Sequence, residues 1–86
     1  MSVLLSSPIE GELVLVRVRI ESRQLEDVLE SLAELPFPVN PDLSHSGIQS
    51  LIEFPAFAAR IDAVRKTLES FGAELTTQSM LAAIQR

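Results

Sequence analysis

Residues 13–20 alternate between two kinds of side chain in a way that is typical of a β-strand. One row is entirely β-branched: Val14, Val16, Val18 and Ile20. The other row mixes leucines with arginines: Leu13, Leu15, Arg17 and Arg19. Because successive strand side chains point to opposite faces of a sheet, the pattern predicts a strand that is buried on one face and partly wet on the other.

A helix is predicted over residues 23–34. Its apolar residues recur at helical spacing: Leu25, Val28, Leu29, Leu32 and Ala33. Ser22 is the expected N-cap, and the acids Glu26 and Asp27 in the first turn suit the helix dipole. Pro36 ends the helix.

The second half of the chain repeats this order. Residues 48–54 alternate again, with one row of Ile48, Ser50, Ile52 and Phe54 and another of Gln49, Leu51 and Glu53. Pro55 is expected to open a second helix, and Gly72 to end it. That helix has a regular apolar stripe: Phe57, Ile61, Val64, Leu68 and Phe71.

Three segments have weaker patterns. Residues 37–41 contain Pro38 and Pro41, which lack the N–H of a ladder donor, so any strand there is expected at a sheet edge, and residues 42–47 are expected to form a turn. Residues 73–78 predict a short strand, whereas residues 80–86 are left open between strand, helix and tail. Residues 1–8 are expected to be a loose leader.

The predicted order is strand, helix, weak strand, strand, helix, strand. It indicates an α+β fold of the ferredoxin-like βαββαβ kind, a plait with a four-stranded antiparallel sheet and two helices on one face. The strands are then expected in the spatial order fourth, first, third, second, with the two best strands in the centre. Residues 1–86 suffice for a single domain with its core at about 13–79.

Composition excludes several function classes. The chain has no cysteine, which removes disulfides and thiolate metal sites, and its net charge of −5 is the wrong sign for contacts with nucleic acid or anionic membranes. The amino end has no basic residue and only a three-residue apolar run, so neither a signal peptide nor a membrane span is expected and the expected location is cytoplasmic. No cofactor motif is present.

The chain resembles the ACT-like branch of the ferredoxin-like plaits over residues 13–79. The likeness is carried by the architecture and by residues 25–32, which are similar to the leucine-led helix that follows the family's first strand. The resemblance implies a small regulatory domain that binds a ligand at a subunit interface. The family's Asp, Pro and Gly before that leucine are replaced here by residues 21–24, Glu-Ser-Arg-Gln, so its amino-acid site is not carried over.

Candidate chemistry is sparse. His45 is the only histidine, and Asp42 lies three residues before it, a pair that would supply two metal ligands or a base with its orienting group. The simpler interpretation is a polar turn, and the acids of residues 26–34 fit a solvated helix face. We therefore predict no catalytic residue and no metal site, and expect a protein that is not an enzyme.

The sheet face without helices is the most informative feature. Its predicted residues are half apolar and half charged, and they form the candidate ligand site or interface: Leu13, Leu15, Arg17, Arg19, Gln49, Leu51 and Glu53. Apolar patches of this kind usually mark contact surfaces, so a homodimer through this face is the main expectation, with a small-molecule ligand there as the second. A small enzyme of the dimeric α+β barrel kind and a protein-interaction module remain alternatives.

Overall fold

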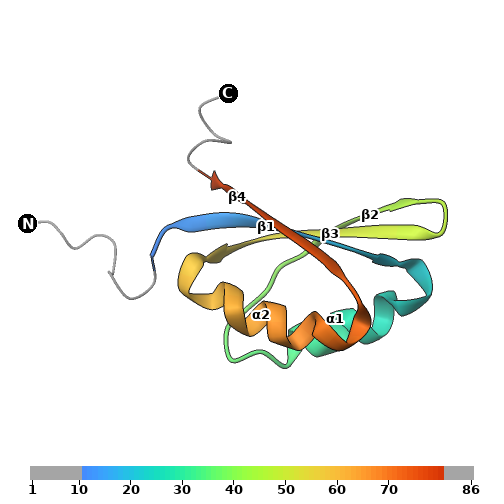
Figure 1. The fold of residues 1–86 in the computed structure, drawn as a ribbon, viewed down its shortest axis with the longest axis horizontal. Helices are drawn as coiled ribbons and strands as arrows, with labels where there is room; N and C mark the ends of the chain where they lie inside the picture. The colour runs from blue at the N-terminus through green and yellow to red at the C-terminus, as the bar shows by residue number, and fades with distance from the viewer. Residues whose placement is uncertain (1–10, 81–86) are drawn as a thin grey trace, which may run out of the picture.

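A computed structural model describes residues 11–80 and has the predicted α+β architecture. Four antiparallel strands form one sheet in the order β2-β3-β1-β4, and both helices lie on the same side of it (Figure 1). The elements follow one another as β1 (Leu13–Glu21), α1 (Leu25–Ala33), β2 (Asp42–Ser46), β3 (Gln49–Phe57), α2 (Ile61–Leu68) and β4 (Glu74–Ser79). The βαββαβ topology and the strand order are thus confirmed.

β1 occupies the centre of the sheet because it pairs on both edges. All nine of its residues are in register with β3, from Leu13 opposite Phe57 to Glu21 opposite Gln49. Six of them also pair with β4, from Val14 opposite Ser79 to Arg19 opposite Glu74. This double pairing fixes the faces of both neighbouring strands, since side chains of directly opposed residues point to the same side.

The core lies between the helices and the β-branched row of β1. It contains the predicted buried residues of the strands and helices, among them Val16, Val18, Leu32, Ile52, Phe54, Val64 and Leu68. Leu29 and Ile61, which the pattern also assigns to the core, are partly buried and pack against it.

The position of β2 corrects the sequence prediction. The expected strand at residues 37–41 is absent, and the expected turn residues Asp42–Ser46 form the strand instead. The physical reason is that Pro38 and Pro41 have no N–H to donate to a strand ladder, whereas residues 42–46 contain no proline. Gly47, at φ 65°, and Ile48 make the two-residue loop to β3, so Ile48 is 78% exposed and does not join the core row.

The end of β3 is a second correction. The strand continues through Pro55 to Phe57, so Pro55 does not open a helix and Phe57 does not belong to the helical stripe. β2 pairs with β3 only as far as Glu53, which leaves Pro55 on a free edge where a missing N–H is tolerated. A 3₁₀ turn at Ala58–Arg60 leads into α2.

The helix boundaries also differ in detail from the pattern. α1 begins at Leu25 after a 3₁₀ turn at Ser22–Gln24, so its N-cap is Gln24 and not Ser22, whose hydroxyl oxygen lies 2.8 Å from that of Ser50. Gly72 has φ 67° after the last turn, as the sequence predicts. A loose leader is expected over residues 1–8, and a strand, helix or tail over residues 80–86. Residues 1–8 and 81–86 lie outside the described residues.

Replacing the buried Leu68 with alanine tests this core. Leu68 is 2% exposed, so the substitution leaves a cavity under the sheet and should lower the free energy of unfolding by about 2–5 kcal/mol. Lys66→Ala on the exposed side of the same helix is the control and should change it by less than about 0.5 kcal/mol. Equal losses in urea titrations of the two variants would remove Leu68 from the core.

Candidate functional site

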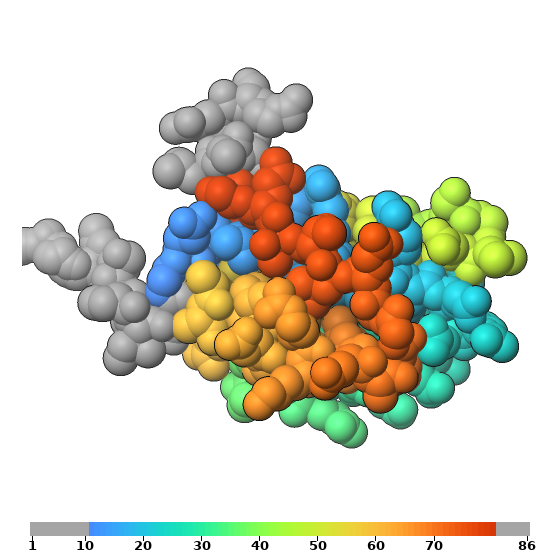
Figure 2. Space-filling view, viewed as in Figure 1, coloured from blue at the N-terminus to red at the C-terminus, as the bar shows by residue number. Residues whose placement is uncertain are grey.

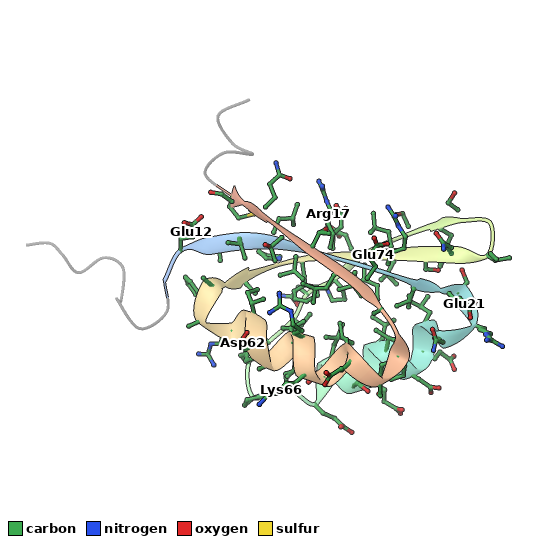
Figure 3. The ribbon with its side chains drawn as sticks, viewed as in Figure 1. Glu12, Arg17, Glu21, Asp62, Lys66 and Glu74 are labelled. Carbon is green, nitrogen blue, oxygen red and sulfur yellow. The ribbon has the colours of Figure 1, made fainter. Side chains whose placement is uncertain are left out.

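The open face is the side of the sheet that no helix of the described chain covers. In Figure 3, Arg17 projects from this side, while Asp62 and Lys66 lie on α2 below the sheet. β1 exposes its predicted mixed row here, and its burial alternates residue by residue along the strand. The register adds the side chains of the other strands, so the open face consists of Leu13, Leu15, Arg17, Arg19, Glu21, Asp42, Ser44, Ser46, Gln49, Leu51, Glu53, Pro55, Phe57, Glu74, Thr76 and Gln78.

The apolar end of the open face is made by Leu13, Leu15, Pro55 and Phe57. Leu13 is opposite Phe57, and Leu15 is opposite Pro55, so the four side chains are direct neighbours. Leu13 is 40% exposed and Phe57 is 43% exposed, whereas Leu15 is half-buried. Four adjacent apolar side chains form a contiguous patch, which is more informative than isolated exposed leucines.

The charged centre of the open face is formed by Arg17, Arg19, Glu53 and Glu74. Nε of Arg17 donates to Oε2 of Glu53 at 2.7 Å across the β1–β3 ladder. Nη1 of Arg19 is 3.5 Å from Oε1 of Glu74 on β4, at the limit of a hydrogen bond. The Arg17 pair is therefore the tighter of the two.

These ion pairs add little to the stability of the folded chain. The side chains of Arg17 and Glu53 are 46% and 32% exposed, and those of Arg19 and Glu74 are more exposed still. Exposed pairs of this kind contribute at most about 1 kcal/mol because water and salt screen them. The pairs matter for the orientation of a partner, because the charged centre presents both signs of charge to a surface that approaches it.

A shallow hollow of about 340 Å³ lies over this centre. It is lined by two arginines, two glutamates, a leucine and a threonine: Arg17, Arg19, Leu51, Glu53, Glu74 and Thr76. The lining offers donors, carboxylates and one apolar side chain to a small polar molecule. Its titratable side chains are Arg17, Arg19, Glu53 and Glu74, and they are engaged in the two ion pairs with one another.

The sequence located much of this surface and missed part of it. All seven predicted residues lie on the open face, three of them in the hollow's charged centre: Arg17, Arg19 and Glu53. Pro55, Phe57, Glu74 and Thr76 were not predicted. Phe54 and Ala56 continue the buried row of β3, so the same alternation places Phe57 on the open face. The sequence prediction lacks Phe57 because Pro55 favours a helix start.

His45 lies on the other face of the sheet, in a short chain of hydrogen bonds. Nδ1 of His45 is 2.8 Å from Oγ of Ser50, and the same oxygen is 2.8 Å from Oγ of Ser22. Ser50 is 2% exposed, and its hydroxyl can donate to one neighbour and accept from the other. The cluster thus satisfies a buried hydroxyl and ties the β2–β3 hairpin to the 3₁₀ turn that precedes α1.

The proposed pairing of His45 with Asp42 is not supported by the strand geometry. His45 is opposite Ser50 on the helix side, whereas Asp42 is opposite Glu53 on the open face. The two side chains therefore point to opposite sides of β2 and do not converge on one ion. Among residues 11–80, no group of three or more His, Cys, Asp or Glu side chains is placed to hold a metal.

Comparisons with protein-family models, curated proteins and solved structures find no match to this chain. In the part of the chain that the structure describes, none of the helices has the length and apolar character to cross a membrane.

Zinc titration tests the interpretation of His45. Because Asp42 and His45 lie on opposite faces, zinc should leave the melting temperature of the wild type unchanged, and it should leave that of His45→Ala unchanged as well. The variant itself should melt lower, since the buried Ser50 loses a hydrogen-bond partner. A zinc-dependent rise seen in the wild type alone would contradict this interpretation.

Proposed function

We propose that this protein is a small self-associating domain of ACT-like type that dimerises through the open face of its sheet. The observation that carries the proposal is the apolar end, where Leu13, Leu15, Pro55 and Phe57 are adjacent and no described helix covers them. Burying apolar surface is favourable by about 25 cal/mol per Å², so a second copy gains most at this end.

The size of the open face supports a dimer interface. The strands lie about 4.8 Å apart and contain 9, 5, 9 and 6 residues at about 3.4 Å each, which makes a flat face of about 470 Å². Side-chain relief raises the accessible area above this flat estimate, toward the roughly 800 Å² per partner of a standard protein interface.

The charges of the open face favour a second copy over a partner of one sign. Arg17 and Arg19 lie beside Glu53 and Glu74, so the centre is self-complementary under a two-fold axis. A strongly acidic or basic partner would meet like charges in the same patch. We therefore choose the homodimer over a module for an unrelated protein.

A small-molecule ligand is the second function that a specific observation favours. The hollow of about 340 Å³ lies inside the proposed interface, and the ACT-like resemblance implies ligand binding between subunits. The enzyme alternative has less support, because the titratable groups that line the hollow are two arginines and two glutamates already joined in ion pairs, and His45 lies on the opposite face. We retain a cytoplasmic location as part of this proposal.

A double lysine variant tests the interface. Leu15→Lys with Leu51→Lys places four added charges in a symmetric dimer while leaving the helix-facing core intact, so the variant should sediment as a folded monomer. Ala33→Lys with Ser70→Lys adds the same charge on exposed helix positions and is the matched control. The wild type and the control should remain dimeric at micromolar concentration.

Two outcomes would overturn the proposed interface. One is a wild type that is monomeric at high micromolar concentration. The other is a double lysine variant that has the circular dichroism of the wild type and remains dimeric. Either would leave the apolar end without a partner.

Native mass spectrometry of the purified protein tests the ligand. The proposal predicts a species at twice the 9.4 kDa chain mass, with any bound small molecule adding a discrete increment to that species and none to the monomer. Arg19→Ala should lower the fraction of dimer that carries the increment, because Arg19 lines the hollow. An increment carried equally by monomers would place the ligand elsewhere.

A further inference from the structure

The side chains of the open face are sorted along the strands rather than across them. Reading the register from one end, Leu13 and Phe57 form the first row, Leu15 and Pro55 the second, and Arg17 and Glu53 the third. The fourth row is mixed, with Arg19 beside Leu51, and the fifth is polar, with Glu21 beside Gln49. The apolar end and the polar end are therefore about 27 Å apart along the strands.

This sorting constrains how two open faces can meet, a question that rests on the proposed dimer. When two sheets pack face to face, a two-fold axis relating them lies between them, parallel to both. It can run along the strands, across them, or diagonally so that the strands cross at nearly a right angle. These three arrangements bring different residues together.

An axis across the strands is opposed by both charge and polarity. It places each strand over its own copy in the partner, so an axis through the middle row sets Arg17 against the Arg17 of the second copy. It also reverses the rows, which sets Leu13 and Phe57 against the row of Glu21 and Gln49. Buried polar groups without partners are costly, and like charges repel.

A diagonal axis is also unfavourable. With the strands crossed at nearly a right angle, only the centres of the two faces overlap, and the apolar ends remain in water. The favourable burial of Leu13 and Phe57 would then be lost.

An axis along the strands between β1 and β3 gives the complementary arrangement. It places β1 over the partner's β3 without reversing the rows. Arg17 of one copy then faces Glu53 of the other, Leu13 faces Phe57, and Leu15 faces Pro55. We propose that the homodimer has this axis, so that Arg17 and Glu53 of each copy form an alternating four-residue ion-pair cluster at its centre.

The arrangement also brings the two hollows together. Each hollow is lined by residues of the third and fourth rows, chiefly Arg17, Arg19, Glu53 and Glu74. Because the axis keeps rows matched, the hollow of one copy faces the hollow of the other. A small polar ligand in the dimer would then contact both copies.

Cross-linking tests the axis directly, because the chain has no native cysteine. Leu13→Cys and Phe57→Cys chains, one of them isotopically labelled, are mixed and treated with a bis-maleimide that spans about 10 Å, the usual separation of packed sheets. Leu13→Cys mixed with Gln49→Cys is the control, since Gln49 lies on the same face at its other end. The first mixture should give at least tenfold more cross-linked heterodimer.

The outcomes separate the axis from the dimer itself. Preferential linking of position 13 to position 49 in a dimeric protein would overturn the proposed axis and leave the face-to-face dimer standing. A dimer by sedimentation with neither link would place the interface elsewhere and contradict both proposals. A monomeric wild type would contradict the dimer before the axis is considered.

A charge exchange provides a second test that does not depend on cysteine variants. Arg17→Glu and Glu53→Arg each put like charges at the proposed centre, so each variant alone should dimerise at least tenfold more weakly than the wild type. A mixture restores opposite charges at both contacts and should recover heterodimers. Folded variants that fail to recover on mixing would contradict the Arg17 to Glu53 contact between copies.

Discussion

The pairing of β1 along both edges is the constraint on which the rest of the structure depends. Its nine residues are held by β3 on one side, and six of them by β4 on the other. Its β-branched row must therefore face the helices. A shift of one residue in the pairing register would expose that row to water and bury the arginines in the core. The same alternation that builds the core also presents Arg17 and Arg19 on the open face.

Both helices lie on one side of the four-stranded sheet, and no described helix covers the other side. In this chain the uncovered side is neither uniformly polar nor uniformly apolar, because leucines, a proline and a phenylalanine occupy one end and ion pairs occupy the centre. Such sorting is of no evident use to an isolated monomer. It is the pattern expected of an interface with an apolar contact and a charged region that sets its orientation.

Much of this could be predicted from the sequence because strand alternation is a strong local signal. Residues 13–20 and 48–54 defined both central strands and all seven predicted residues of the open face. The failures occurred where two local preferences competed. Proline is common at a helix start, but here a free strand edge tolerates Pro55. Only the tertiary pairing of β2 with β3 decides between a helix start and a continued strand.

β2 shows a second limit of sequence reasoning. Its five residues are all exposed and mostly polar, so no hydrophobic alternation distinguishes them from a turn. They form a strand because β3 offers them a ladder, which is a nonlocal effect. The hydrogen-bonded chain of Ser22, Ser50 and His45 was missed for the same reason, since its members come from three separate segments.

The most direct test of the open-face interface is an isotope-filtered NMR measurement on a mixture of labelled and unlabelled chains, which detects only contacts between copies. The account predicts cross-peaks from the methyl groups of Leu13 and Leu15 in one copy to the ring of Phe57 in the other. Cross-peaks confined to residues on the outer sides of α1 and α2, or none at high micromolar concentration, would contradict it.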